Sequence, residues 1–349
     1  MISSASPFRH SVRMLTTASV AIIAYLAGGS LKAPRADEAV TLTLYSGQHE
    51  QSVNLLVADF QKQTGITVKV HSGEGPEIAN QIAEEGKSSP ADVYFTENAP
   101  ELTILSEKDL LAPVDPKTLA EIPAKYNSPK GDWVGVLARE NVLVYNTTMV
   151  KASELPKSVL DLAEPAYKGK IGIAPSDADF LPLVSAVAAV KGKDAALKWL
   201  KGLEENAQTF DDDEGVVAAV DRGSVATGII NNYYWARLQQ EIGKGKMHSA
   251  LYHFGKGDVG GVINVSGAAV VKSTTHAEAA QKFLAYLVSV PAQTLLAQGD
   301  INFEYPLHPG VAANPVLKPF NELQPPAVGI SQLGDDSAAG ELLREAGLL

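Results

Sequence analysis

The sequence contains no cysteine among its 349 residues. This absence excludes disulfide bonds, thiolate metal sites, iron–sulfur clusters and cysteine nucleophiles. It also removes the side chain that carries the lipid of a surface lipoprotein, so we expect no membrane anchor. Beyond the N-terminal region, the sequence has no apolar run of the roughly 20 residues that a membrane-spanning helix needs.

Common catalytic motifs are absent as well. The sequence has no GxSxG elbow, no HExxH helix and no phosphate-binding P-loop. A secreted hydrolase that uses Glu97 and His49 as acid and base stays an alternative. The absence of these motifs favours a binding protein, and we therefore do not expect an enzyme.

The N-terminus has the pattern of an export signal. Basic residues Arg9 and Arg13 precede an apolar segment from Met14 to Ala27, and small residues follow at positions 28–30. We expect a signal peptide at residues 1–36, cleaved between about 29 and 36. The alternative is a buried N-terminal helix. An exported chain without a lipid anchor is expected in a Gram-negative periplasm.

The chain is acidic, with a formal net charge of −11. Cleavage at Ala36 would remove four basic residues and no acidic ones, leaving 25 basic and 40 acidic residues and a formal charge of −15. Such a surface repels nucleic acid and anionic membranes and is compatible with attracting cations. We expect no nucleic-acid partner.

The hydrophobic pattern alternates between strands and helices. Apolar side chains follow period two in the expected strands and i, i+3, i+4 spacing in the expected helices. This order predicts an α/β fold with a mostly parallel sheet and helices on both faces. The first segments are a strand at 40–45, a helix at 53–65, a strand at 66–70, a helix at 76–86 and a strand at 91–95. Later segments are strands at 170–174, 226–230 and 261–271, and helices at 180–190, 195–203, 278–288 and 340–349.

We interpret this pattern as two α/β lobes that can close over a ligand. The chain is expected to cross between them at residues 141–146 and again near 261–265. The predicted N-terminal lobe comprises residues 37–140 and about 264–315. The predicted C-terminal lobe comprises residues 141–263 and about 316–349.

Four potential metal ligands follow predicted strands. His49 and Glu97 come after the first and third strands, and the adjacent Tyr233 and Tyr234 come after the strand that ends at Ile230. Ligands bind beyond the carboxyl ends of strands in open parallel sheets. Two phenolates and one carboxylate neutralise Fe³⁺, and hard oxygen donors suit such an ion better than zinc or copper(I). Taken alone, each residue also has a structural explanation: His49 as a helix cap, Glu97 as a solvated loop residue, and the two tyrosines as aromatic residues of the core.

Several runs together resemble the periplasmic ferric-iron-binding proteins of ABC importers. The resemblance covers essentially the whole chain after the export signal, in one order. It rests on residues 44–49 (LYSGQH), 89–97 (SPADVYFTE) and 230–235 (INNYYW), and also on 195–203, 265–270 and 304–307.

The resemblance implies a two-lobed type II periplasmic binding fold with a two-strand hinge that closes over one Fe³⁺. It implies iron ligation by His49, Glu97, Tyr233 and Tyr234, completed by an exogenous anion such as phosphate or carbonate and by water. It also implies delivery to an inner-membrane ABC permease, and we expect a monomer. Two alternative functions remain: a receptor for another metal or for a small organic or phosphorylated ligand, and a protein that presents its ligand to a membrane sensor.

The sequence departs from the family where the anion is expected. The family has a Ser-Gly-Ala loop there, but this chain has Asp177, Ala178 and Asp179, and Asp213 stands where the family has Asn. Asp177 and Asp213 would repel phosphate if ionised, so we expect weak or absent dependence on it, with one of these two aspartates contacting the metal or its water. The alternative is that they are solvated helix caps. Two further residues beside the ligands could donate hydrogen bonds: Asn98, where the family often has Gln, and Asn231.

Overall fold

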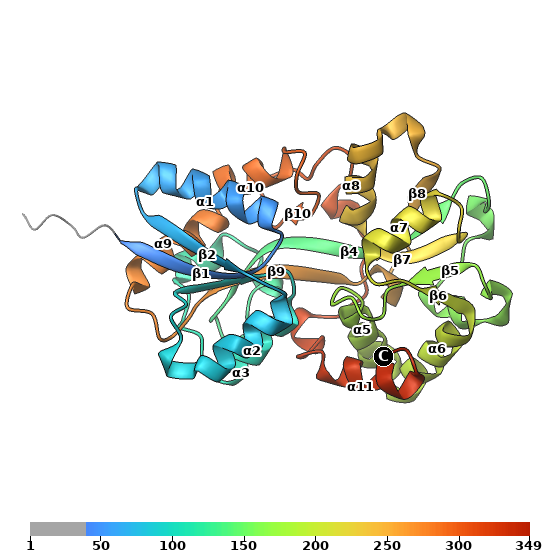
Figure 1. Cartoon of the computed structure of the whole chain (residues 1–349), viewed down its shortest axis with the longest axis horizontal. Helices are drawn as coiled ribbons and strands as arrows, with labels where there is room; N and C mark the ends of the chain where they lie inside the picture. Colours follow the sequence, from blue (N-terminus) through green and yellow to red (C-terminus); the bar gives the residue numbers. More distant parts are fainter. Residues whose placement is uncertain (1–39) are drawn as a thin grey trace, which may run out of the picture. The chain divides into compact units, whose positions relative to one another are not determined.

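The computed structural model describes residues 40–349 (Figure 1). The predicted signal peptide lies outside the described residues. The strand order in the sheets is β2 (Thr67–Ser72), β1 (Thr41–Gly47), β3 (Val93–Thr96), β9 (Ile263–Val270), β4 (Val134–Asn146), β7 (Thr227–Asn231), β5 (Ile171–Ile173) and β6 (Ala207–Thr209). Strands β8 (Ser249–Tyr252) and β10 (Tyr305–Pro306) also pair with β4. No helix in residues 40–349 is long and apolar enough to cross a membrane.

The first part of the chain forms a parallel unit, as its pattern predicts. β1 pairs in parallel with β2 on one side and with β3 on the other. Helix α1 buries Val53, Leu56, Val57 and Phe60, and it ends at Gly65, whose φ of 73° favours glycine. Its elements are β1 (Thr41–Gly47), α1 (Glu50–Thr64), β2 (Thr67–Ser72), α2 (Gly75–Glu85), β3 (Val93–Thr96), α3 (Ala99–Glu107) and α4 (Pro116–Ala120).

Strand β4 (Val134–Asn146) belongs to two sheets. Its residues from Val134 to Glu140 pair with β9 (Ile263–Val270), and those from Asn141 to Tyr145 pair with β7 (Thr227–Asn231). Figure 1 shows β4 and β9 running between the two groups of elements. The partner of β4 therefore changes between Glu140 and Asn141.

The second sheet repeats the strand–helix alternation. β7 pairs antiparallel with β4, and β5 pairs in parallel with both β7 and β6. Its elements are β5 (Ile171–Ile173), α5 (Leu181–Lys191), α6 (Lys193–Asn206), β6 (Ala207–Thr209), α7 (Asp213–Asp221), β7 (Thr227–Asn231), α8 (Asn232–Ile242) and β8 (Ser249–Tyr252).

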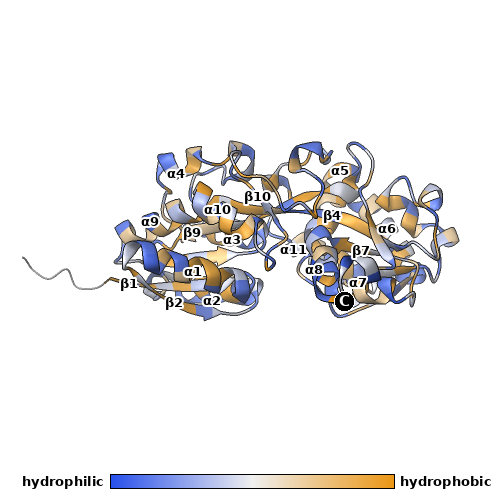
Figure 2. Cartoon of the chain, turned by 90° about the horizontal axis from the view of Figure 1, so that it is seen from above, coloured by the Kyte–Doolittle hydropathy of each residue, from blue (hydrophilic) through white to orange (hydrophobic). Residues whose placement is uncertain are grey.

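The last part of the chain packs against both groups. Helix α9 contacts β9, whereas α11 packs on α5 and α6. Hydrophilic and hydrophobic residues alternate along the helices (Figure 2), as expected for helices that bury one face. The elements are α9 (Ala277–Leu287), α10 (Val290–Ala297), β10 (Tyr305–Pro306) and α11 (Ser337–Ala346).

The α/β prediction is confirmed, but the prediction of a mostly parallel sheet is wrong at its centre. Every ladder that involves β4 or β9 is antiparallel. These two long strands connect the two sheets, and each runs in the direction opposite to that of the strands beside it. Only the outer ladders, between β1, β2 and β3 and between β5, β6 and β7, are parallel.

Candidate metal centre

His49 and Glu97 lie against each other. His49 is the residue before α1, and Glu97 directly follows β3. The His49 Nδ1 and Glu97 Oε1 atoms are 2.8 Å apart, and the two side chains are 15% and 17% exposed. Within residues 40–349, the buried His49 Nε2 atom has no hydrogen-bond partner. One ring nitrogen is therefore held by the carboxylate and the other is available to a ligand.

Tyr233 and Tyr234 lie in the first turn of α8, which begins at Asn232 directly after β7. Their ring centroids are 4.1 Å apart, so adjacent residues present neighbouring rings here. The His49 ring meets the Tyr233 ring edge-on, with the centroids 5.2 Å apart. The structure thus places His49, which precedes α1 of the first unit, against Tyr233 in α8 of the second.

Three helices begin at this site. The residues that precede α1, α3 and α8 are His49, Asn98 and Asn231, and none of these side chains caps its own helix. The N-terminus of a helix carries free N–H groups and a partial positive charge. Helix N-termini of this kind favour negative charge in the space that they face.

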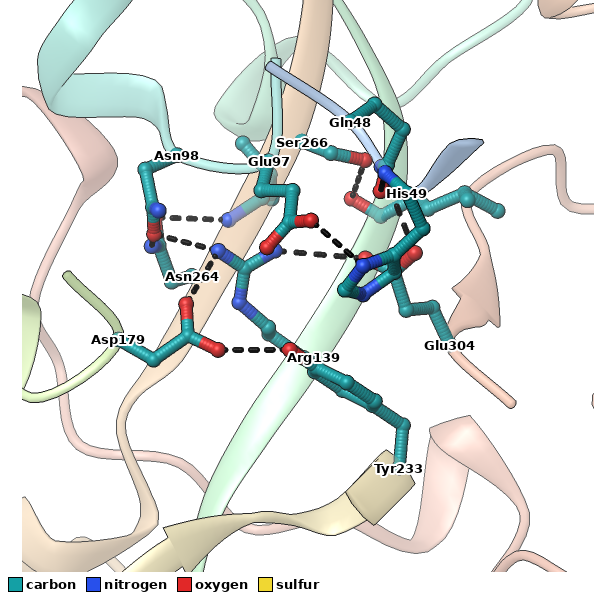
Figure 3. Close-up of polar contacts among 12 residues, drawn as sticks. Gln48, His49, Glu97, Asn98, Arg139, Asp179, Tyr233, Asn264, Ser266 and Glu304 are labelled. Carbon is teal, nitrogen blue, oxygen red and sulfur yellow. Dashed lines mark hydrogen bonds and ion pairs between the residues drawn. The ribbon is translucent and has the colours of Figure 1, made fainter. Parts of the chain in front are cut away.

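Tyr233 is hydrogen-bonded to an aspartate that the sequence did not indicate as a ligand. The Tyr233 hydroxyl donates to Asp179 Oδ2 at 2.7 Å, and Arg139 Nη2 donates to Asp179 Oδ1 at 2.9 Å (Figure 3). Arg139 is fully buried, and its guanidinium also donates to Asn98 and, at 3.3 Å, to Glu304 Oε1. A buried cation thus holds acceptors from three distant segments of the chain.

The ionisation of these groups follows from burial and charge. Burial, together with the charge of Asp179, raises the pKa of Tyr233 and of Tyr234 well above the ordinary value of a phenol. Burial also raises the pKa of the Asp179 carboxyl, but the Arg139 guanidinium and the Tyr233 hydroxyl outweigh it, and the pKa lies below the ordinary value. Both phenols are therefore neutral at pH 7 without a metal, whereas Asp179 is ionised.

The residues expected in the anion region take different positions. The Asp177 carboxylate accepts the backbone N–H groups of Asp179 and Asp213, at 3.0 and 3.1 Å. Asp213 is buried and accepts the Asn231 N–H at 2.8 Å, so its carboxyl faces backbone. Burial, followed by the neighbouring aspartates, raises the pKa of Asp213 well above its ordinary value. Burial likewise raises the pKa of Asp177 to about 6.

The remaining two residues of that region also have defined places. Ala178 lines the cavity described below. Asn98 also lines it, and its Oδ1 accepts both from Arg139 and, at 2.6 Å, from Asn264 Nδ2. The Asn98 oxygen is thus held by buried donors.

A cavity of about 600 Å³ joins the elements of both sheets at this site. His49, Glu97, Asp177, Asp179 and Tyr234 line it. Tyr233, which is 1% exposed, does not line it, and neither do Asp213 and Asn231. A larger cavity of about 940 Å³, lined mostly by prolines and apolar residues between positions 306 and 325, lies elsewhere and contains none of the predicted ligands.

Within residues 40–349, no group of three or more His, Cys, Asp or Glu side chains is arranged to hold a metal ion. The predicted set of His49, Glu97, Tyr233 and Tyr234 contains only two residues of these types. The assignment of these four residues as ligands remains a prediction. It depends on the phenols of Tyr233 and Tyr234 as much as on the Glu97 carboxylate and the His49 imidazole.

Sequence reasoning did not single out Asp179, Arg139 or Glu304. One signal was present: Arg139 and Glu140 interrupt the long apolar run of β4, where an unpaired charge would be costly. Their partners could not be inferred, because Asp179 and Glu304 lie 40 and 165 residues away along the chain.

Two α/β units that share long strands, with a ligand-sized cavity lined from both, define a two-lobed binding protein of the type II periplasmic fold. The chain belongs to the bacterial extracellular solute-binding protein family, whose sequence profile matches residues 56–324.

Relatives and solved structures agree with this family. The chain is 37% identical to the Fe(3+)-binding periplasmic protein of Serratia marcescens, over 97% of this chain and 99% of that protein. It is 38% identical to the major ferric iron-binding protein of Neisseria meningitidis, over 88% and 93%. The structure is similar to iron-bound HitA from Pseudomonas aeruginosa, with a TM-score of 0.84, 42% identity and coverage of 88% and 100%. The ferric binding protein from Campylobacter jejuni has a TM-score of 0.81 and 26% identity, with coverage of 88% and 99%.

Proposed function

We propose that this chain is a periplasmic receptor that binds one Fe³⁺ ion between its lobes and delivers it to an inner-membrane ABC permease. The convergence of His49, Glu97, Tyr233 and Tyr234 at the starts of three helices carries this proposal. The names of the relatives from Serratia and Neisseria support iron as the cargo. In this account the chain binds and releases an ion and catalyses no reaction.

The ligand set suits a hard trivalent cation. Two phenolates and the Glu97 carboxylate supply three negative charges, and a neutral His49 imidazole adds a donor without charge. Oxygen donors of this kind favour small, highly charged ions over thiophilic ones. Both phenols are neutral without a metal, so the ion has to displace their protons. A strong Lewis acid such as Fe³⁺ does this, because a bound cation lowers the pKa of its ligands.

We propose further that the Asp179 carboxylate takes the place of an exogenous anion. Its Oδ2 atom lies 2.7 Å from the Tyr233 hydroxyl oxygen. When the phenol loses its proton, two anionic oxygens at this distance need a cation between them. Two oxygen ligands at right angles, each about 2.0 Å from a small octahedral cation, are about 2.8 Å apart. The observed separation is that of an ordinary hydrogen bond and is also compatible with two adjacent ligands of one ion. Within residues 40–349, no three His, Asp or Glu side chains are already arranged around one ion, so iron binding has to draw His49, Glu97 and Asp179 together.

The same region is poorly suited to phosphate. The Asp177 carboxylate already accepts two backbone N–H groups that an external anion could otherwise use. We therefore expect iron binding without phosphate or carbonate, with water filling any position that the protein leaves open.

Native mass spectrometry of the metal-stripped protein tests the cargo. Incubation with ferric nitrilotriacetate should give one bound iron per chain, with a mass that shows displaced protons. Zn²⁺ and Mg²⁺ at the same concentration should give little bound metal. If ferric ion is not retained while another metal or a small organic compound is, the chain is a receptor for that cargo instead.

A further inference from the structure

We propose that the cavity of about 940 Å³ is a second binding site, which takes a small organic anion with an apolar body, and that its occupation is linked to closure of the lobes. We call it the rear cavity. Its lining residues lie within 123–126 and 306–325, together with Ile263. The link to closure rests on the proposed function, whereas the site itself does not.

The rear cavity lies on the opposite face of the long strands from the proposed iron site. Asn264 of β9 donates to Asn98, which lines the iron-site cavity. The preceding residue, Ile263, lines the rear cavity. Consecutive residues of a strand point to opposite faces of the sheet. The two cavities share no lining residue, so a ligand in one does not contact a ligand in the other.

The walls of the rear cavity are apolar and rigid. Leu317 and Leu323 are 7% and 9% exposed, and the Phe320 ring centroid lies 5.9 Å from that of Tyr126 and 5.0 Å from that of Tyr305. Because proline fixes φ, a wall rich in proline has little freedom to lose when a ligand binds. The volume lies within the range of about 300–1,000 Å³ that small-molecule sites occupy. Six prolines line the rear cavity: Pro123, Pro306, Pro309, Pro315, Pro319 and Pro325.

The charge of the rear cavity favours an anion. In the part of the chain that the structure describes, no Asp or Glu lines it, although the chain has 40 acidic residues. Its two basic side chains are those of Lys125 and His308. His308 Nε2 lies 3.1 Å from Glu121 Oε2. Lys125 Nζ lies 4.6 Å from the Tyr126 ring centroid, and no ion pair within residues 40–349 includes it. Apolar walls beside this cation suit an apolar body that ends in a carboxylate.

The walls are attached to both lobes. At one end, Pro306 pairs with Leu137 in the part of β4 that belongs to the first sheet. At the other end, the Gln324 carbonyl accepts the N–H of Gly257 at 3.0 Å, and Gly257 follows β8 of the second sheet. The segment 306–325 therefore connects the two lobes, and a change in their relative orientation changes the cavity.

This attachment gives the link its direction. In the present structure, the lobes meet where the His49 and Tyr233 rings lie 5.2 Å apart, and the rear cavity is formed at the same time. A ligand that fits the cavity in this arrangement favours it over more open ones. A ligand in the rear cavity should therefore increase iron affinity, and iron should increase the affinity for that ligand by the same factor.

Isothermal titration calorimetry of the metal-stripped protein with octanoate, octan-1-ol and octylammonium tests the site. The expected result is one octanoate per chain, bound at least ten-fold more tightly than octylammonium and more tightly than octan-1-ol. No octanoate binding, or equal affinity for all three compounds, would overturn the proposal.

A lysine variant tests whether the anion binds in the rear cavity. Lys125→Gln should weaken octanoate binding about ten-fold, as expected for loss of one charge-assisted contact, and should leave octan-1-ol binding unchanged. The control is Lys117→Gln, at an exposed lysine of α4 that does not line the cavity, and it should keep the wild-type affinity. Equal losses in both variants would place the anion elsewhere and overturn the assignment of the site.

Iron loading tests the link. Octanoate should bind the ferric-loaded protein about three- to ten-fold more tightly than the metal-stripped protein, and octan-1-ol should show a change in the same direction. Equal octanoate affinity with and without iron would overturn the link. A protein that binds octanoate in this way but retains no ferric ion from ferric nitrilotriacetate would overturn the proposed function and leave the site intact.

Discussion

The hydroxyl group of Tyr233 donates a 2.7 Å hydrogen bond to Oδ2 of Asp179, and this bond joins a proposed metal ligand to a buried, ionised carboxylate. Arg139 fixes the other carboxylate oxygen at 2.9 Å. Asp179 thus both holds the phenol in place before iron arrives and lies where an anionic ligand is needed after the phenolic proton leaves.

Replacing Tyr234 by Phe should weaken Fe³⁺ binding by at least 100-fold. Loss of an outer hydrogen-bond partner typically costs a metal site about 10–100-fold, and loss of an anionic ligand should cost more. Equilibrium competition against a ferric chelator measures the change. Tyr252→Phe, at a partly buried tyrosine on β8 that does not line the cavity, is the matched control and should keep the wild-type affinity. Unchanged iron affinity in Tyr234→Phe would rule out this ligand.

The Asp179→Asn variant separates a protein-supplied anion from an external one. Asn keeps the shape and an oxygen for Arg139 but removes the charge next to Tyr233. Without phosphate or carbonate, affinity should fall about 10–100-fold, as for disruption of a ligand or its close partner. Adding either anion should restore part of it, whereas wild-type affinity should not respond.

Asp194→Asn, at an exposed residue of α6, controls for the loss of one negative charge. If wild-type affinity depends on phosphate as strongly as that of Asp179→Asn, Asp179 does not replace the anion.

Iron affinity should rise with pH. The pKa of both phenols lies well above the ordinary value because they are buried next to Asp179, so each is protonated over the whole accessible range. Binding as phenolates releases one proton from each, so acid opposes binding and base favours it. With two protons released, affinity should change by up to about 100-fold per pH unit between pH 5 and 7. Competition titrations, corrected for protonation of the chelator, measure this slope. A flat profile would mean that the phenols stay protonated in the complex.

Removing the Arg139 guanidinium should destabilise the metal-free protein. Arg139→Met leaves Asp179 and Glu304 buried without their cation, and breaking a buried pair in this way costs about 3–5 kcal/mol. Urea unfolding followed by circular dichroism measures the loss. Arg237→Met is the control, because its pair with Glu214, which is 66% exposed, contributes at most about 1 kcal/mol. Similar losses in both variants would show that the Arg139 contacts carry no special stability.

Local pattern was sufficient to predict most of the elements. The spacing of apolar residues predicted helix α1, and Gly65 predicted where it ends. Tyr233 and Tyr234 follow a strand, as expected. The sequence left open how adjacent tyrosines could reach one site. In the structure, α8 begins directly after β7, and its first turn places the two rings next to each other.

The partners of Arg139 could not be predicted, because they depend on tertiary packing. The Arg139 side chain gathers Asn98, Asp179 and Glu304 from different segments of the chain, and Glu304 lies outside regular structure. Asp213 shows the opposite case. Its position, where the family has Asn, suggested a role beside the metal, but its carboxyl accepts the backbone N–H of Asn231 and does not line the cavity.

The most direct measurement is a visible absorption titration of the metal-stripped protein with ferric citrate, in the presence and absence of phosphate. Our account predicts a purple-red tyrosinate-to-iron band that saturates at one equivalent and forms equally well without phosphate. No band under either condition would mean that Tyr233 and Tyr234 are structural and that the chain binds another cargo.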